Sequence, residues 1–375
     1  MQNICLDYLL ISSNSRKIYQ ENVFNGISYP NNYIIQYRYD LKYLEKELYD
    51  AIFNEGIYYI QSTLNNFFKN KKCALSYFHI EGVKTELFLF RRGIIKHAVY
   101  NSDINRLLLF IELKEFLELE DNTLTIDFKN SIIDKFNDFS TCVFDLQSRG
   151  HIFENIKTAK FHQIAYIFSS LIQAKLFYTV TLKEKFNDFG INEYSRVISP
   201  VLDLSTNLSK YKLIDGSNYF LEILTFEVDN SKYQLPSKKN TKEKSNFKVE
   251  ISSESITINQ HILDSGSFNL NYIDLMIKPI SSETVNTSIK LIEPQTGFIT
   301  NILIDIKKSK FRSILFALSS FIVLVTVPIA NIFKNFLTSS NNNINISPFF
   351  IFSFIVFILF VTGSLRFLYR YFDKK

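Results

Sequence analysis

The first 140 residues combine short alternating apolar runs with two segments of helical spacing. Alternation predicts strands, whereas apolar residues that recur every three or four positions predict helices. Helices are expected at Leu41–Phe53, where Asp40 is placed to cap the first turn, and at Ile57–Phe68. Strands are expected at Ile4–Ile11, Tyr33–Tyr39, Cys73–Ile80, Glu86–Tyr100, Arg106–Leu113 and Thr123–Phe128. Residues 1–140 are therefore predicted to form a compact α+β domain with a mostly antiparallel sheet.

The period changes to that of a helix over Asn155–Lys175. The stripe of apolar residues at helical spacing comprises Phe161, Ala165, Phe168, Ile172 and Leu176. The uncharged run within it, Gln163–Ala174, has twelve residues, which is too short to cross a bilayer. We therefore expect residues 141–198 to form a helical connector.

From Ser199 onward, short apolar runs are separated by turns about every ten residues. This spacing is typical of an immunoglobulin-like β-sandwich. Strands are expected at Tyr219–Val228, Phe247–Ser252, Ser255–Ile258, Phe268–Ile277, Ser288–Ile292 and Phe298–Ile306. Residues 199–308 are predicted to form this all-β domain, on spacing alone, because no Cys…Trp…Cys signature accompanies it.

The last part of the chain, residues 309–375, contains two long segments without a charge. Ser313–Phe333 has 21 residues and Ser347–Leu365 has 19, and a helix needs about 20 to cross the hydrocarbon core. The thirteen residues between them, Lys334–Ile346, are polar. The sequence therefore predicts a C-terminal transmembrane hairpin with spans at about 313–333 and 347–365.

The formal net charge of +5 is unevenly distributed. Lys307–Lys375 carries nine basic residues and one acid, so the preceding 306 residues carry a net charge of −3. Basic residues flank both spans, whereas the loop between them has only Lys334, so the positive-inside rule places both flanks in the cytosol. We expect a multi-pass protein of the inner (plasma) membrane with cytoplasmic N- and C-termini. The mildly acidic head argues against nucleic acid as a partner.

Small side chains in the two spans bear on whether the hairpin does more than anchor. Neither span contains an ionisable residue, which argues against an ion site or a proton relay there. Small residues allow membrane helices to approach closely. Those singled out for helix packing are Ser313, Ala317, Thr326, Ala330 and Gly363. A simple anchor and an oligomerising, membrane-perturbing hairpin both remain open.

One constellation has the composition of a magnesium site. Glu112-Leu113-Lys114 on a predicted strand, with Asp103 upstream and a helix acid such as Glu45 or Glu47, resembles the PD-(D/E)xK nuclease arrangement. That resemblance implies carboxylates that hold Mg²⁺ and a lysine that assists the attacking water. An ordinary charged strand is the alternative reading, since Asp103 lies in an expected turn.

The remaining candidates are two arginines and a few possible metal ligands. Arg91 and Arg92 could receive a phosphate-bearing ligand. His79 and His97 could meet near Cys73, but no third ligand can be named, so neither a metal site nor a cofactor is expected. The chain has no GxxxxGK[ST] or GxGxxG loop, and its three cysteines lack CxxC spacing, which favours reduced thiols.

Three functions fit this layout. The first is a membrane-anchored, cytosol-facing sensor and effector, whose architecture resembles bacterial anti-phage effectors that join a sensory head to a short transmembrane hairpin. The second is a scaffold that recruits a cytosolic protein to the membrane. The third is a membrane-tethered nuclease that uses Asp103, Glu112 and Lys114. The partners expected are the lipid bilayer and a protein partner or a second copy of the chain.

Overall fold

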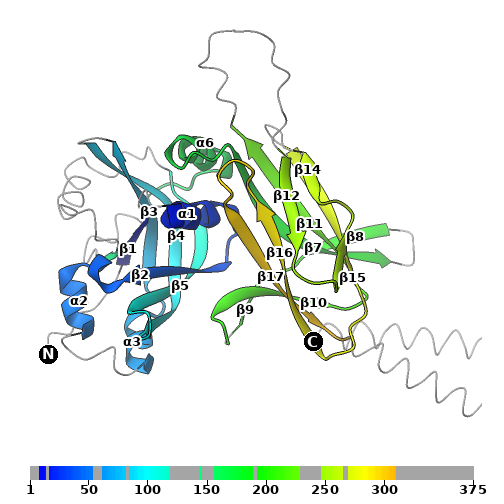
Figure 1. Ribbon diagram of the computed structural model, residues 1–375, viewed down its shortest axis with the longest axis horizontal. Coiled ribbons are helices and arrows are strands. Elements are labelled where there is room, and N and C mark those ends of the chain that lie inside the picture. The colour runs from blue at the N-terminus through cyan, green and yellow to red at the C-terminus, as the bar shows by residue number, and fades with distance from the viewer. Residues whose placement is uncertain are drawn as a thin grey trace, which may run out of the picture. The chain divides into compact units, whose positions relative to one another are not determined.

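The computed structural model describes ten ranges of the chain and is drawn in Figure 1. These ranges are residues 8–13, 17–53, 61–81, 84–118, 143–145, 156–188, 192–203, 205–228, 246–264 and 269–309. Both expected spans, with Ser313, Ala317, Thr326, Ala330 and Gly363, lie outside them, as does the expected strand Thr123–Phe128. Within these ranges, no helix has the length and apolar character needed to cross a membrane.

Three β-sheets and a few short helices make up the described residues, so the expected β-rich character is confirmed. The first sheet has the strand order β2-β5-β4-β3-β1-β6. Its strands are β1 (Tyr8–Ser13), β2 (Ile34–Asp40), β3 (Lys72–Glu81), β4 (Lys84–Asn101), β5 (Arg106–Phe116) and β6 (Val143–Asp145). Every neighbouring pair is antiparallel except β1 and β3, so the mostly antiparallel sheet was also predicted correctly.

The helices differ more from expectation. Helix α1 (Lys17–Ser28) was not predicted, although its buried residues Val23, Phe24 and Ile27 have helical spacing. The expected helix Leu41–Phe53 is broken into a 3₁₀ turn, η1 (Leu41–Tyr43), and α2 (Lys46–Phe53), and the Asp40 side chain does not cap it. Asp40 instead binds Arg106 at 2.7 Å across β2 and β5. The next helix, α3, spans Gln61–Phe68.

Among the described residues of the expected helical connector, the helix is α6 (Phe161–Leu171). The chain then forms β7 (Leu176–Asp188) and β8 (Asn192–Val197), which belong to a sheet of order β13-β15-β11-β7-β8. In Leu176–Asp188, polar residues alternate with the buried residues Tyr178, Val180 and Leu182, which is the period of a strand. This strand was missed because the preceding apolar stripe has helical spacing. The other members of this sheet are β11 (Asn218–Glu227), β13 (Ile256–Ile258) and β15 (Asn269–Ile277).

The remaining sheet has the order β14-β12-β16-β17-β10-β9. Its strands are β9 (Val201–Asp203), β10 (Leu208–Ile214), β12 (Asn246–Ile251), β14 (Ile262–Asp264), β16 (Thr284–Ile292) and β17 (Ile299–Lys307). Tyr178 of β7 joins the two sheets, because its hydroxyl donates to the Leu291 carbonyl at 3.0 Å and its ring stacks on Phe247. These two sheets are therefore packed against each other in the manner of a β-sandwich.

The chain divides into two compact units, of which the larger holds Met1–Lys212, Ser217–Ile277 and Asn286–Asp305. The smaller holds Leu213–Gly216, Lys278–Val285 and the residues from Ile306 onward. Within the smaller unit the buried Asp215 carboxylate accepts hydrogen bonds from the backbone N–H groups of Ser309, at 2.7 Å, and Ile280, at 3.2 Å. This one side chain therefore ties the residues that follow β17 to two other segments.

Replacing Asp215 by Asn should destabilise the protein by about 1–3 kcal/mol, because the new amide N–H₂ would face a backbone donor and leave it unsatisfied. The matched control is Asp274→Asn on the exposed face of β15, where a change below about 0.5 kcal/mol is expected. Denaturant unfolding of the two variants checks the prediction. Equal stabilities of the two variants would contradict the role assigned to Asp215.

Candidate functional site

Asp103 lies apart from the other two residues of the nuclease hypothesis, Glu112 and Lys114. Asp103 lies in the exposed turn between β4 and β5, whereas Glu112 lies six positions along β5 from Arg106, where the turn ends. Six residues of strand span about 20 Å. Among the described residues, no group of three His, Cys, Asp or Glu side chains could hold a metal ion. The resemblance to a nuclease site therefore does not extend to the geometry.

Glu112 and Lys114 instead form a charge network on the surface of β4 and β5. The Glu112 carboxylate contacts the ammonium of Lys96 at 2.8 Å and that of Lys114 at 2.9 Å. Desolvation raises the pKa of Glu112, but the hydrogen bonds from the two lysines outweigh it, so this pKa lies below its ordinary value. Lys114 also donates to the Asn32 side chain at 2.8 Å, so its ammonium is occupied within the chain.

The three candidate metal ligands are also spread along the strands. His79 lies opposite Glu86 in the pairing of β3 with β4, and Cys73 lies opposite Gly93 at the other end of the same pairing. His97 lies beyond that end and packs its ring against Phe110 of β5. Burial raises the pKa of the Cys73 thiol, which keeps it protonated.

Arg91 does not have the exposed position that binding a phosphate-bearing ligand would require. Its side chain is fully buried on β4. It donates to the carbonyls of Lys114 at 2.7 Å, of Tyr29 at 2.8 Å and of Gly26, and to the Asn31 side chain at 2.8 Å. Its guanidinium also lies 4.4 Å from the centre of the Phe116 ring. Four of its five N–H donors are therefore used by the chain itself.

Arg91 of β4 lies beside the C-terminal end of α1, and this position explains how its buried charge is tolerated. The Gly26 carbonyl belongs to the C-terminal turn of α1, which carries the negative end of the helix dipole, and Tyr29 directly follows that turn. A Cβ on Gly26 would lie 2.9 Å from the Phe90 ring, so glycine lets the helix approach β4 this closely. Burial lowers the pKa of Arg91 to about 9, which leaves the guanidinium charged at neutral pH. Its neighbour Arg92 donates to the Ile156 carbonyl.

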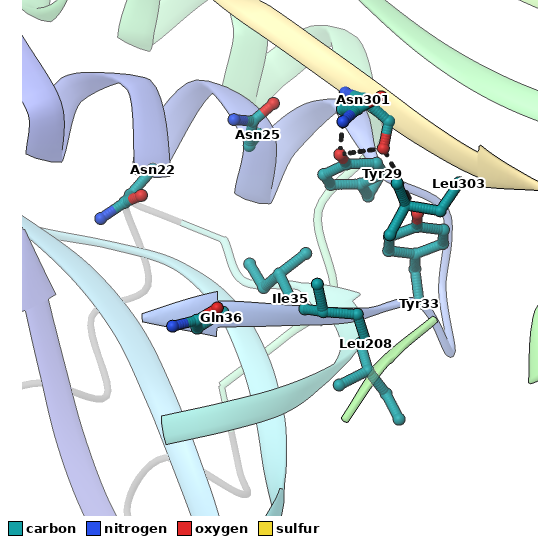
Figure 2. A pocket seen from close by; sticks show the side chains of 10 residues that line it. Asn22, Asn25, Tyr29, Tyr33, Ile35, Gln36, Leu208, Asn301 and Leu303 are labelled. Carbon is teal, nitrogen blue, oxygen red and sulfur yellow. Dashed lines mark hydrogen bonds between the residues drawn. The ribbon is translucent and has the colours of Figure 1, made fainter. Parts of the chain in front are cut away.

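The same helix end forms one wall of a cavity of about 220 Å³ (Figure 2). The cavity is bounded by α1, β2, β10 and β17 and has no charged side chain in its lining. Its polar lining consists of Asn22, Asn25, Tyr29, Tyr33, Gln36 and Asn301. Its apolar lining consists of Ile34, Ile35, Leu208 and Leu303. We call it the amide cavity, because four of the lining side chains are amides.

A pair of tyrosines closes one end of the amide cavity. The rings of Tyr29 and Tyr33 are stacked, with centroids 4.1 Å apart. The Tyr29 hydroxyl donates to the Asn301 carbonyl at 2.8 Å and accepts from the Asn301 N–H at 3.0 Å, as the dashed lines in Figure 2 mark. Burial raises the pKa of both phenols, so they remain neutral hydroxyls. Tyr29 therefore joins the chain after α1 to the backbone of β17.

Three further contacts fix α1 against the strands of the two packed sheets. The Phe24 ring lies among those of Phe177, Tyr178 and Phe298, with centroids 5.4–5.6 Å apart. The Thr300 hydroxyl donates to the Asn25 side chain at 2.9 Å. The Ile299 N–H donates to Glu21 at 3.2 Å. One face of α1 thus packs on β7 and β17 through both apolar and polar contacts.

None of the cavity residues was a candidate from the sequence alone. Lys17–Ser28 was assigned no element, and the amides of Asn22, Asn25 and Gln36 have no motif spacing. The helical recurrence of Tyr19, Val23 and Ile27 was the signal that could have revealed α1. The joining of α1 to β17, about 270 residues later in the chain, had no sequence signal.

Comparison with known proteins adds little to this geometry. No protein-family model matches the chain, and no curated protein matches its sequence. Among solved structures, the crystal structure of a FixG-related protein from Vibrio parahaemolyticus aligns with 35% of this chain and 95% of its own length. The identity is 8% and the TM-score is 0.19, so the fold and the site rest on the geometry of this chain.

Arg91→Met should destabilise the protein by about 3 kcal/mol, because it leaves the carbonyls of Gly26, Tyr29 and Lys114 buried without a donor. Arg38→Met, on the exposed edge of β2, is the matched control and should change stability by less than about 0.5 kcal/mol. Chemical denaturation measures both. If Arg91→Met were as stable as the control, the structural role assigned to Arg91 would be wrong.

Proposed function

We propose that the protein is a membrane-anchored, cytosol-facing sensor and effector in bacterial anti-phage defence. In this proposal the β-rich head, with its immunoglobulin-like sandwich, receives the signal. The C-terminal hairpin then oligomerises or perturbs the membrane. The observation that carries the proposal is the pair of uncharged segments, Ser313–Phe333 and Ser347–Leu365, flanked by nearly all the excess basic charge of the chain.

The connection between head and hairpin supports this coupling. Only twelve positions separate Asn301, which binds Tyr29, from Ser313, where the first expected span begins. β17 fills most of that distance, and the Ser309 N–H, just after β17, donates a hydrogen bond to the Asp215 carboxylate. A paired strand transmits displacement better than a flexible linker of the same length would. A change at the contact of Tyr29 with Asn301 could therefore reach the hairpin along one strand.

The two other functions are less well supported. The nuclease hypothesis depends on Asp103, Glu112 and Lys114 acting together, and β5 separates the first of these from the other two. The scaffold hypothesis remains the main alternative, because a hairpin that only anchors would have the same sequence. It differs in one respect that can be tested: a scaffold tolerates an unrelated anchor.

The test measures membrane potential in bacteria that express the full chain, with and without phage challenge. Phage should depolarise cells that express the natural chain. Ala317→Leu combined with Gly363→Leu should reduce the depolarised fraction by about tenfold, because bulky side chains block close helix packing. The matched control is Val323→Leu, which lies in the same span as Ala317 but replaces no small residue. It should behave as the natural chain does.

A chimera that carries an unrelated two-span anchor separates effector from scaffold. We expect it to reach the membrane and leave the potential unchanged. Protection by this chimera without depolarisation would favour the scaffold. Absence of depolarisation by the natural chain under phage challenge would exclude the effector.

A further inference from the structure

We propose that the outward face of the sheet β13-β15-β11-β7-β8 binds a second copy of this chain, sheet against sheet, about a two-fold axis. This face carries exposed apolar side chains and a charge pattern that is complementary to itself. The inference deepens the function proposed above, because it gives the head its own contact in the oligomer that the hairpin would form. Pairing of the heads does not itself require that the hairpin perturb a membrane.

The outward face of this sheet is apolar at positions where a β-sandwich normally has polar residues. The exposed apolar side chains there are those of Leu270, Tyr272 and Met276 in β15 and of Val197 in β8, with 44, 48, 65 and 57% of their surface accessible. The residues between them in β15, Ile273 and Leu275, are buried in the sandwich, so the exposed set points outward. A contiguous apolar face of this kind indicates a surface that a partner covers.

The other sheet of the sandwich has a polar outward face. Lys210 of β10 contacts Asp305 of β17 at 3.5 Å there, and Glu250 of β12 lies opposite Lys290 of β16. The two sheets therefore differ in the surface that they present. The apolar outward face belongs to the sheet that contains β15, which makes it the candidate interface.

The charges on this apolar face are balanced. Two lysines, Lys183 and Lys185, lie on β7, whereas the acids Glu222 and Asp274 lie on β11 and β15. Within one chain Lys183 contacts Glu222 at 2.6 Å and Lys185 contacts Asp274 at 2.5 Å. A strongly acidic or strongly basic partner would be repelled by half of these groups. A partner with the same two stripes, one basic and one acidic, fits them both.

The strand register shows how two copies match. Lys183 of β7, Phe220 of β11 and Asp274 of β15 form one row across the sheet, and β11 is the central strand of the five. A two-fold axis along β11, between two facing sheets, places β7 of each copy over β15 of the other. Lys183 then faces Asp274 of the second copy at two equivalent places, and Phe220 faces its counterpart. Glu222 lies beside the axis, where Lys183 of its own chain neutralises it.

The face is also large enough for a stable contact. β7, β11 and β15 have 13, 10 and 9 residues, and β8 and β13 extend the sheet on either side. With strands about 4.8 Å apart and a rise of about 3.4 Å per residue, the sheet measures roughly 20 by 30 Å. That area is comparable with the ~800 Å² that each partner buries in a stable complex. Its size therefore favours a second sheet over a single short peptide.

Cysteine cross-linking tests which faces meet. Leu224 lies on β11 beside the proposed axis, so Leu224→Cys should be joined to its counterpart by a short bismaleimide. The experiment uses the full chain in detergent micelles, with Cys5, Cys73 and Cys142 replaced by alanine. Asn286→Cys, on the polar outward face, is the control and should give at least about fivefold less cross-linked dimer, because that face does not meet itself.

Charge exchange tests the register of the two copies. Asp274→Lys would face Lys183 of the second copy, and Lys183→Asp would face its Asp274, so each variant alone should associate at least about tenfold more weakly. An equimolar mixture of the two variants restores both opposite-charge pairs and should associate within about threefold of the natural chain. Light scattering over a concentration series measures this. Lys212→Asp, exposed on β10, is the control and should associate as the natural chain does.

Four results would overturn the inference: a natural chain that stays monomeric at micromolar concentration, equal cross-linking at Leu224→Cys and Asn286→Cys, a mixture that associates no better than either variant alone, or unchanged association of Tyr272→Lys. Oligomers held only by the hairpin would be insensitive to these substitutions and would overturn it too. Membrane depolarisation is measured separately. Heads that pair in cells that never depolarise would leave this inference standing and remove the function proposed above.

Discussion

The buried guanidinium of Arg91 is the interaction on which the rest of this structure depends. A charged group without a carboxylate partner is tolerated in a protein core only when its donors are satisfied. Arg91 achieves this through three backbone carbonyls and one amide oxygen, most of them at the end of α1. The consequence is that the last turn of α1 and the chain that follows it have one position relative to β4.

The position of this helix end determines where Tyr29, the amide cavity and β17 lie. Tyr29 leaves the fixed turn, stacks on Tyr33 and binds the backbone of Asn301 in β17. The amide cavity exists because α1 and β2 are held beside β17 at this separation. β17 in turn ends at Lys307, and Asp215 holds the residues after it. β17 thus connects the contact between Tyr29 and Asn301 with the part of the chain proposed to enter the membrane.

Sequence reasoning succeeded where the signal was local. The alternating runs in Tyr33–Tyr39 and Arg106–Leu113 predicted β2 and β5 closely, because the period of a strand is visible in the order of residues. It failed where tertiary contacts decide. In the sequence Arg91 is half of an arginine pair expected to be exposed, and only the fold buries it against carbonyls 62 and 65 residues away. The amide cavity joins residues near 30 and 300, and no spacing rule connects them.

We propose that residues 309–375 form a hairpin that crosses the membrane twice, with the head in the cytosol. Its most direct test is cysteine labelling of intact cells with a membrane-impermeant maleimide. With this topology, Ser340→Cys, in the loop Lys334–Ile346, should react from outside the cell. The native Cys5, Cys73 and Cys142 should give no labelling before lysis. Labelling of Ser340→Cys only after lysis would contradict this topology.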